Sequence, residues 1–189
     1  MATMIRTARF LQASAIALVV VLLVGAVERL GCGPVPPARE HVRGEVSFVY
    51  DGDTVEVSGA GRVRLLGVDA LDSHNRSKIR SQVRHLEMDR QRVIHWAREA
   101  EEFLRRELLD REVQLEFGPE RRGDHGRLLA YVYVKKNGER RNVNRVLLQK
   151  GYATAYRAFD HPLKGDFIET EREARRQNRG LWQDARSTW

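Results

Sequence analysis

The chain has 189 residues, enough for one domain of about 150 residues with an extension and too few for two full domains. Hydrophobic residues make up 42% and charged residues 31%, which excludes a mainly disordered chain, and the single cysteine excludes an internal disulfide and a cysteine-based zinc site. The net charge of +7 favours an anionic partner, with nucleic acid first among the candidates, although a genome that encodes its positive charge as arginine would produce the same composition.

Residues 1–40 have the composition of a signal peptide or membrane anchor followed by a proline-rich linker. Arg6 and Arg9 precede an apolar run over residues 10–27, whose length suits either a membrane-spanning helix or a long signal peptide. Because the basic end is expected to stay in the cytoplasm, the rest of the chain is predicted to be exported. Small residues near Ala26 offer a cleavage site, so the exported part is either secreted or anchored to the membrane.

The folded domain is predicted to span residues 41–189 and to begin with short strands. Asp51-Gly52 lies between two β-rich runs and predicts a hairpin, and the glycines at 59–61 predict a second turn. The first three predicted strands cover residues 46–50, 54–57 and 63–68.

A helix is predicted next, after a polar and basic stretch over residues 73–92 that has no clear apolar stripe and is expected to form a long loop. From Val93 the apolar residues share one helical face: Val93, Ala97, Ala100, Leu104 and Leu108. The remaining predicted elements are strands over 113–117 and 127–134, a turn at 137–138, a helix over 142–151 and a charged helix over 166–179.

Three strands, a helix, two strands and further helices fit a small five-stranded barrel of the OB type. The predicted fold class is therefore a β-barrel plus helices (α+β). About three helices are expected on the barrel, with an apolar helix in residues 1–40 before it, and the protein is expected to be a monomer.

Three carboxylates are expected to meet at one corner of the barrel. Asp53 follows the first turn, and Asp69 and Asp72 follow the third strand, where neighbouring strand ends can converge. Such a cluster repels itself unless a hard cation neutralises it, and carboxylate oxygens suit Ca²⁺ or Mg²⁺. Taken singly, Asp51-Gly52-Asp53 is more often an ordinary turn, and Asp72 could likewise be the start of a loop.

Two arginines are candidates for binding phosphate. Arg64 lies in the apolar run 63–68, where a charge is costly unless it is paired, although it could instead face solvent on an alternating strand. Arg127 stands at the mouth of a strand, after the segment 123–126, and could equally be a plain surface arginine.

Taken together, these segments resemble the staphylococcal nuclease (thermonuclease) family from about residue 42 to residue 182. The matching segments, in the family's order and spacing, are DGDT at 51–54, RLLGVD at 64–69, DHGRLLAYV at 124–132, VN at 143–144 with LLQKGYA at 147–153, and RGLW at 179–182. The resemblance implies an OB-type barrel that carries a calcium-dependent nuclease site.

The resemblance also implies a role for each matched residue. Asp53 and Asp69 correspond to the carboxylate ligands of Ca²⁺, and Ala70 to a residue that binds the ion through its backbone carbonyl. Arg64 and Arg127 correspond to the arginines that hold phosphate oxygens and counter the charge of the transition state. Asp72 stands where the family has a glutamate that positions or deprotonates the attacking water.

The segment over 69–72 departs from the family's usual Asp-Thr-Pro-Glu. Asp72 is one methylene shorter than glutamate, or roughly 1.5 Å, a displacement that can slow a reaction about 10²-fold. Leu71 replaces a proline and loosens the loop. The loop after Asp72 is longer and more basic than in the best-known members, which indicates a reshaped substrate groove.

The implied reaction is cleavage of DNA or RNA on the 5′-oxygen side, leaving a 3′-phosphate, with single-stranded substrates preferred. Tyr156 or Phe159 is a candidate for stacking on a base, although both could be core residues. Glu116 and Asn144 are expected to be structural anchors between barrel and helices. The alternative function is a nucleic-acid-binding module with a weakened active site. The presence of both arginines and of two metal-binding aspartates favours the enzyme.

Overall fold

The fold comes from a computed structural model that describes residues 41–123 and 125–186. The apolar helix predicted within residues 1–40, and Asp124 of the matched segment 124–132, lie outside the described residues. The strands are β1 (His41–Asp51), β2 (Thr54–Val57), β3 (Gly61–Leu65), β4 (Val68–Ala70), β5 (Glu112–Arg122), β6 (Leu128–Lys136), β7 (Glu139–Asn142) and β8 (Ala153–Ala155). The helices are α2 (Arg76–Leu86), α3 (Arg90–Leu108), α4 (Val143–Lys150), α5 (Lys164–Arg176) and the short 3₁₀ helix η1 (Gly180–Gln183).

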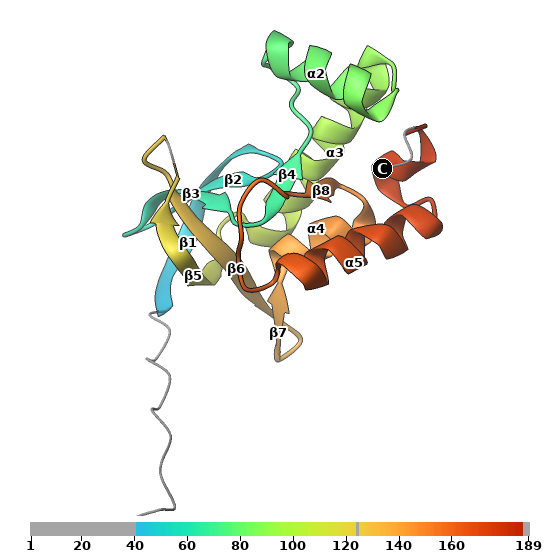
Figure 1. The fold of residues 1–189 in the computed structure, drawn as a ribbon. Coiled ribbons are helices and arrows are strands. Elements are labelled where there is room, and N and C mark those ends of the chain that lie inside the picture. Colours follow the sequence, from blue (N-terminus) through green and yellow to red (C-terminus); the bar gives the residue numbers. More distant parts are fainter. Residues whose placement is uncertain (1–40, 124, 187–189) are drawn as a thin grey trace, which may run out of the picture. The chain divides into compact units, whose positions relative to one another are not determined.

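A closed five-stranded barrel forms the centre of the fold, as predicted. The strand order is β3-β2-β1-β5-β6, and the parallel pairing of β3 with β6 closes the ring. β1 is long enough to pair with β2 through its second half and with β5 through its first half. β7 extends β6 as a hairpin, and β4 pairs with β8 in a separate two-stranded ribbon (Figure 1).

The third predicted strand, over residues 63–68, is divided in the structure. Leu66 and Gly67 form a turn between β3 and β4, and Gly67 has a φ of +78°, a conformation that side chains other than glycine rarely adopt. A Cβ at Gly67 would also lie 2.5 Å from the imidazole of His161. This turn moves Asp69 out of the barrel wall and into the β4–β8 ribbon.

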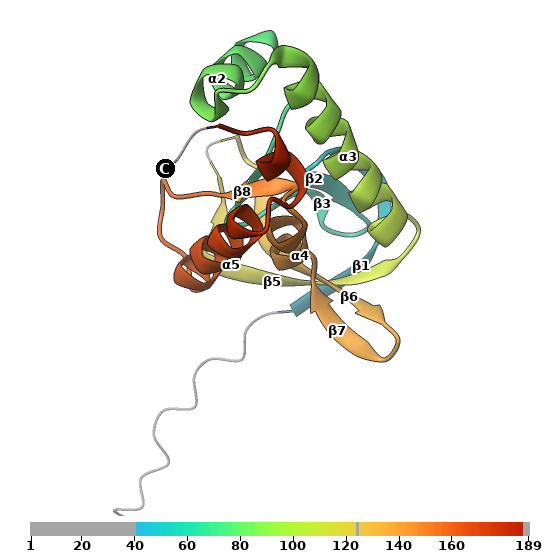
Figure 2. The ribbon, with the colours of Figure 1, turned by 90° about the vertical axis from the view of Figure 1, so that its right-hand side faces the viewer.

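α3 confirms the helix predicted from its apolar spacing. The five residues of the predicted face are all buried, and the helix begins three residues before Val93, where the side chain of Asp89 accepts a hydrogen bond from the backbone N–H of Arg92. α4 and α5 lie side by side, with β8 next to both (Figure 2). Leu181 and Trp182 of η1 are buried, as expected for the segment after α5.

The prediction of a long loop over residues 73–92 is wrong, because most of that segment forms α2. The described residues therefore contain four α-helices rather than about three. Ile79, Val83 and Leu86 have the spacing of one helical face within an otherwise polar segment, and Ile79 and Leu86 are buried in a small second core that includes Val93 and Trp182. Packing against α3 and η1 therefore stabilises this segment as a helix.

The outer faces of α2 and of the other helices are strongly polar. Across the part of the chain that the structure describes, no helix combines the length and apolarity needed to cross a membrane. The apolar run over residues 10–27 is not among those residues.

Candidate active site

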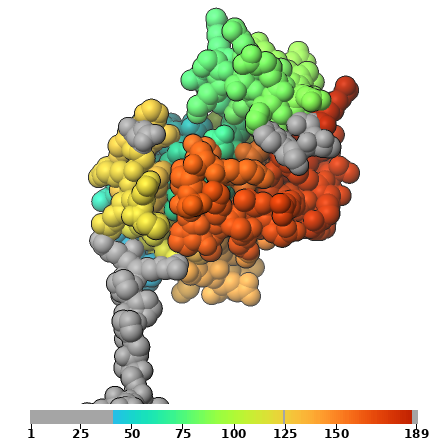
Figure 3. Space-filling view, viewed as in Figure 1, coloured from blue at the N-terminus to red at the C-terminus, as the bar shows by residue number. Residues whose placement is uncertain are grey.

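A hollow of about 330 Å³ lies between the barrel and the segments around it. Its floor is the run from Arg64 to Asp69, which ends β3 and enters β4, and its walls come from Lys78 of α2, the loop before β6 and the segment after β8. Figure 3 shows this teal floor between the green, yellow and orange segments of those walls. The hollow brings together residues that are more than 90 positions apart in the chain, from Arg64 to Phe159.

Arg64 joins two of the predicted metal-binding aspartates. Its Nη1 donates to Oδ1 of Asp53, and its Nη2 donates to Oδ1 of Asp69 at 2.6 Å. Burial by itself lowers the pKa of Arg64, but the charges of Asp53 and Asp69 outweigh it and the pKa is raised. Arg64 is therefore a paired cation at the edge of the hollow and not a surface residue that faces solvent.

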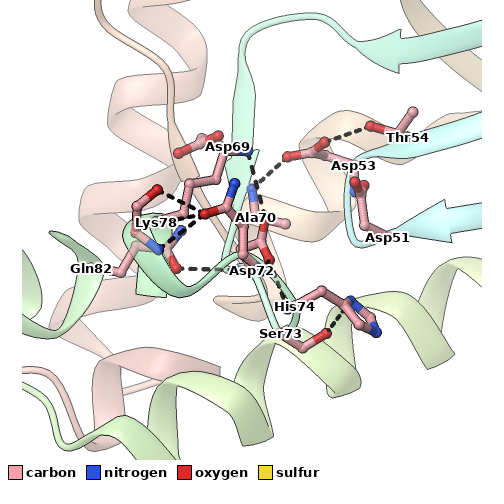
Figure 4. Close-up of polar contacts among 12 residues, drawn as sticks. Asp51, Asp53, Thr54, Asp69, Ala70, Asp72, Ser73, His74, Lys78 and Gln82 are labelled. Carbon is pink, nitrogen blue, oxygen red and sulfur yellow. Dashed lines mark hydrogen bonds and ion pairs between the residues drawn. The ribbon is translucent and has the colours of Figure 1, made fainter. Parts of the chain in front are cut away.

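Asp53 is held by the backbone and side chains around it. Its side chain is almost fully buried; Oδ1 also accepts a hydrogen bond from Thr54 Oγ1 at 2.9 Å, and Oδ2 accepts one from the backbone N–H of Ala70 at 2.9 Å (Figure 4). Asp53, Asp69 and Ala70 thus lie together, as the sequence predicted, because the turn after β1 faces the strand β4. Their metal-binding role stays a prediction.

Asp51 is a member of this cluster that the sequence analysis treated only as a turn residue. Its Oδ1 accepts a hydrogen bond from the backbone N–H of Asp53 at 3.0 Å. Burial, and then the charge of Asp53, raise the pKa of Asp51 to about 6, and the same two causes raise the pKa of Asp69. The hairpin signal had accounted fully for Asp51-Gly52, so no sequence feature marked Asp51 as part of the site.

The donor set fits a hard cation. Three carboxylates lie near one guanidinium, so the cluster of Asp51, Asp53, Asp69 and Arg64 has more acidic than basic groups, and the charge of Asp53 adds to burial in raising the pKa of Asp51 and Asp69. Within the described residues no hydrogen bond reaches Oδ2 of Asp69, so that oxygen keeps its lone pairs for a cation. No group of three or more His, Cys, Asp or Glu side chains in this part of the chain has the arrangement of a preformed metal site.

Arg127 lines the same hollow, together with His125. It is half-buried and forms no ion pair with any described residue, so its guanidinium is available to an anion. The two predicted phosphate-binding arginines therefore border the same hollow, although they come from β3 and from the loop before β6, 63 residues apart in the chain.

Asp72 does not join the other predicted site residues at the hollow. Its Oδ1 accepts hydrogen bonds from the backbone N–H groups of His74 at 2.8 Å and Asn75 at 2.7 Å, and its Oδ2 lies 3.6 Å from Lys78 Nζ (Figure 4). Asp72 closes the turn into α2 and is not among the residues that line the hollow. Its role toward water stays a prediction.

The sequence of this chain is similar to those of known proteins. The family model described as "Staphylococcal nuclease homologue" matches residues 62–184, about two thirds of the chain. The chain belongs to this family. It is 32% identical to the micrococcal nuclease of Shigella flexneri over 163 residues, which cover 81% of this chain and 82% of that protein. It is also 34% identical over 155 residues to an uncharacterized protein of Methanocaldococcus jannaschii (76% and 73% covered) and 29% identical over 163 residues to the thermonuclease of Staphylococcus intermedius (81% and 85% covered).

In this staphylococcal nuclease homologue the aromatic candidates border the hollow. Tyr156 and Phe159 are half-buried, both line it, and their ring centroids are 5.0 Å apart. Phe159 also packs against the barrel core, whereas the backbone N–H of Tyr156 donates to the carbonyl of Gly67 at 3.0 Å and fixes that residue beside the floor. Phe159 is therefore partly a core residue, and Tyr156 is the better placed of the two to meet a base.

Buried polar residues of the nuclease homologue fix the walls. Asn144 of α4 donates to the carbonyls of Leu66 and Ala130 and accepts from Val132 N–H, so it is the anchor between barrel and helix that the sequence predicted. Buried Glu116 pairs with Arg140 of β7 at 3.1 Å, a contact between two strands. Glu171, which the sequence analysis missed within a run of charged residues, is fully buried.

Glu171 holds the segment that carries Tyr156. It accepts from the backbone N–H of Ala155 at 2.9 Å and pairs with Arg157 at 3.0 Å and Arg175 at 2.8 Å. Because Ala155 and Arg157 flank Tyr156, this buried carboxylate positions the aromatic wall of the hollow.

Proposed function

We propose that this protein is a calcium-dependent nuclease that hydrolyses phosphodiester bonds of DNA or RNA with low sequence specificity and leaves 3′-phosphate ends. The observation that carries the proposal is the hollow itself, which is lined by a paired arginine, by an arginine without an ion pair among the described residues and by Asp69 of the acidic cluster. Membership of a family that includes nucleases supports it.

The chain's own residues account for substrate binding and charge stabilisation. Arg64 and Arg127 hold phosphate oxygens from two sides and counter the negative charge that grows in the transition state. Tyr156 offers a ring face to an unpaired base, which favours single-stranded substrates. Asp72 orients the attacking water, and this step requires its carboxylate to turn from the backbone of residues 74–75 toward the hollow.

The residues that would hold Ca²⁺ are Asp53 and Asp69, with the backbone carbonyl of Ala70. When bound, the ion supplies positive charge to the phosphodiester and to the attacking water. With only two direct carboxylate ligands, binding is expected to be weak, at about 10⁻⁴ to 10⁻³ M, which suits an exported enzyme.

Removal of calcium tests this assignment. The full chain is expected to degrade single-stranded DNA and RNA in millimolar Ca²⁺, to stop in EDTA and to recover when Ca²⁺ is restored, with product ends that a 3′-phosphatase can process. At 10 mM Ca²⁺ and a Kd of about 1 mM, binding also stabilises the fold by about 1.4 kcal/mol, measurable as a higher Tm. Full activity in EDTA would contradict the calcium assignment.

The matched variant for this test is Asp53→Asn. Asp53→Ala would leave Arg64 and the backbone N–H of Ala70 without their shared partner, and so would lower stability as well as activity. An asparagine keeps an oxygen acceptor but removes the charge. Asp53→Asn is therefore expected to abolish both cleavage and the calcium-dependent rise in Tm. Binding of nucleic acid without cleavage by the wild-type chain in Ca²⁺ would instead favour the non-catalytic binding module.

We further propose that the protein acts outside the cytoplasm as a monomer, either secreted or anchored through residues 10–27. Because Arg6 and Arg9 flank the apolar run on one side only, a reporter enzyme fused after residue 189 is expected to be active only outside the cytoplasm. A mature N-terminus at Val27 would identify cleavage, and an intact N-terminus in the membrane fraction would identify an anchor. Recovery of the protein as a soluble cytoplasmic species would contradict export.

A further inference from the structure

Helix α2 carries a positive charge that its surroundings do not neutralise. Its sequence, RSKIRSQVRHL, contains three arginines and a lysine and no acidic residue. The side chains of Arg76, Arg80 and Arg84 are exposed and form no ion pair with any described residue. Lys78 pairs with Asp72, at 3.6 Å, and also lines the hollow of the candidate active site.

The other polar helix of the domain is arranged in the opposite way. On α5 the arginines are paired with glutamates of the same helix: Arg172 lies 3.3 Å from Glu169, and Arg176 lies 3.1 Å from Glu169 and also contacts Glu173. On α2, by contrast, no acidic residue of the same helix is present to pair with the arginines. Their charge is available to a partner with negative charge.

The fold holds α2 in a fixed place beside the hollow. Gln82 accepts a hydrogen bond from the backbone N–H of Asp72 at 3.0 Å, and the buried side chains of Ile79 and Leu86 pack in the second core with α3. Because Ile79 and Leu86 are almost fully buried in this packing, Val83 is the one apolar side chain of α2 that stays half-buried, which is too little apolar surface to insert into a lipid bilayer. Charge, therefore, is what the exposed face offers.

The exposed residues form an arc from one flank of α2 to the other. At about 100° per residue, Arg76, Arg80 and Arg84 lie within about 80° of one another, and Lys78 lies on the opposite flank, about 10–12 Å away across the helix. The small side chains of Ser77 and Ser81 lie between the flanks. On the arginine flank, a depression of about 420 Å³ is lined by Arg76, Arg80, Ile79 and Val83 of α2 and by Arg90 of α3.

We propose that α2 binds the sugar-phosphate backbone of the substrate strand outside the active-site pocket. A strand that leaves the hollow passes Lys78, crosses the helix over its serines and meets Arg76, Arg80 and Arg84. These arginines contact phosphates and read no sequence. The proposal rests on the proposed nuclease function and extends it, because it makes affinity depend on substrate length.

Binding without cleavage tests the proposal. Fluorescence anisotropy with a labelled single-stranded 30-mer, in EDTA and from 50 to 200 mM NaCl, compares the full chain with the variant Arg76→Gln/Arg80→Gln/Arg84→Gln. Loss of three phosphate contacts is expected to lower the slope of log K against log salt by about 2 and to weaken binding at least 10-fold at 50 mM NaCl. The matched control Arg106→Gln/Arg172→Gln/Arg176→Gln removes the same charge from exposed positions on α3 and α5 and is expected to change binding less than threefold.

Two further comparisons make the result decisive. Replacement of the same three arginines of α2 by lysine is expected to restore most of the affinity, because lysine keeps the charge, and a retained Tm shows that the glutamine variant is folded. In Ca²⁺, the loss of cleavage rate caused by the glutamine variant is expected to be larger for a 30-mer than for a trinucleotide, which is too short to cross α2.

Equal losses in the α2 variant and in the control would overturn the proposal, since net charge alone would then explain binding. Loss of sedimentation with phosphatidylserine vesicles in the α2 variant, with unchanged DNA affinity, would also overturn it and assign the helix to a membrane surface. Absence of cleavage by the wild-type chain, with the expected anisotropy results, would refute the nuclease function and leave the α2 site in place.

Discussion

Replacement of Asp72 by alanine is expected to lower kcat by roughly 10²- to 10⁴-fold with little change in nucleic-acid affinity, if Asp72 is the group that positions the water. The structure adds a second consequence. Because Asp72 accepts the backbone N–H groups of His74 and Asn75 at the start of α2, the alanine variant is also expected to lose about 1 kcal/mol of stability, measured by thermal unfolding.

Asp72→Asn separates these two roles. An asparagine can still accept the two backbone hydrogen bonds, so stability is retained, but it cannot take a proton from water. The rate is therefore expected to fall as far in the asparagine variant as in the alanine variant. Asp72→Glu is expected to raise the rate above that of the wild type, because the longer side chain restores the reach that the family's glutamate has.

A wild-type rate for Asp72→Asn would show that Asp72 is only a turn residue. Glu87 and Asp89 are then poor substitutes, because they lie at the far end of α2, about 16 Å along the helix from its start, and neither lines the hollow. The base would have to be sought among the carboxylates of the acidic cluster, Asp51 and Asp69.

Replacement of Arg127 by alanine is expected to lower kcat by about 10²- to 10³-fold, because a preorganised cation facing the developing charge is lost. Since Arg127 forms no ion pair with a described residue, stability is expected to stay within about 0.5 kcal/mol of the wild type. Arg127→Lys is expected to recover only part of the rate, because an ammonium group cannot hold two phosphate oxygens in one plane.

The control for Arg127 is Arg98→Ala, which removes the same charge from an exposed position on α3 and is expected to leave kcat within twofold. Steady-state kinetics on a defined oligonucleotide gives kcat and KM separately. An increase in KM with an unchanged kcat would contradict the assignment, since Arg127 would then bind substrate and transition state equally.

Much of the barrel could be predicted from local signals. The Asp51-Gly52 hairpin, the five-residue apolar face of α3 and the Asn142 start of α4 all appear in the structure, because each depends on neighbouring residues and on a regular period. The helix α2 was missed, because its three apolar side chains, Ile79, Val83 and Leu86, are outnumbered by polar and charged residues. Their burial depends on packing against Val93 and Trp182 of other elements.

The candidate site shows the same division. The family resemblance of its motifs selected Asp53, Arg64, Asp69, Ala70 and Arg127. In the structure Arg64, Asp69 and Arg127 line one hollow, and Asp53 and Ala70 are hydrogen-bonded beside it. The sequence could not show that Asp51 belongs to the acidic cluster, because the turn signal already explained that residue. Nor could it show that Glu171 is buried, since a glutamate within a charged helix has the pattern of a solvated face.

By itself, then, the sequence determined the residue types, the order of the strands and the family, because those depend on local periods and on motif spacing. Only the tertiary structure decided which of these residues meet. The turn at Gly67 moves Asp69 toward Asp53, closure of β3 on β6 brings Arg127 to the hollow that Arg64 borders, and the turn into α2 draws Asp72 away from it. Contacts between residues far apart in the chain fix these positions, and no local sequence pattern encodes such contacts.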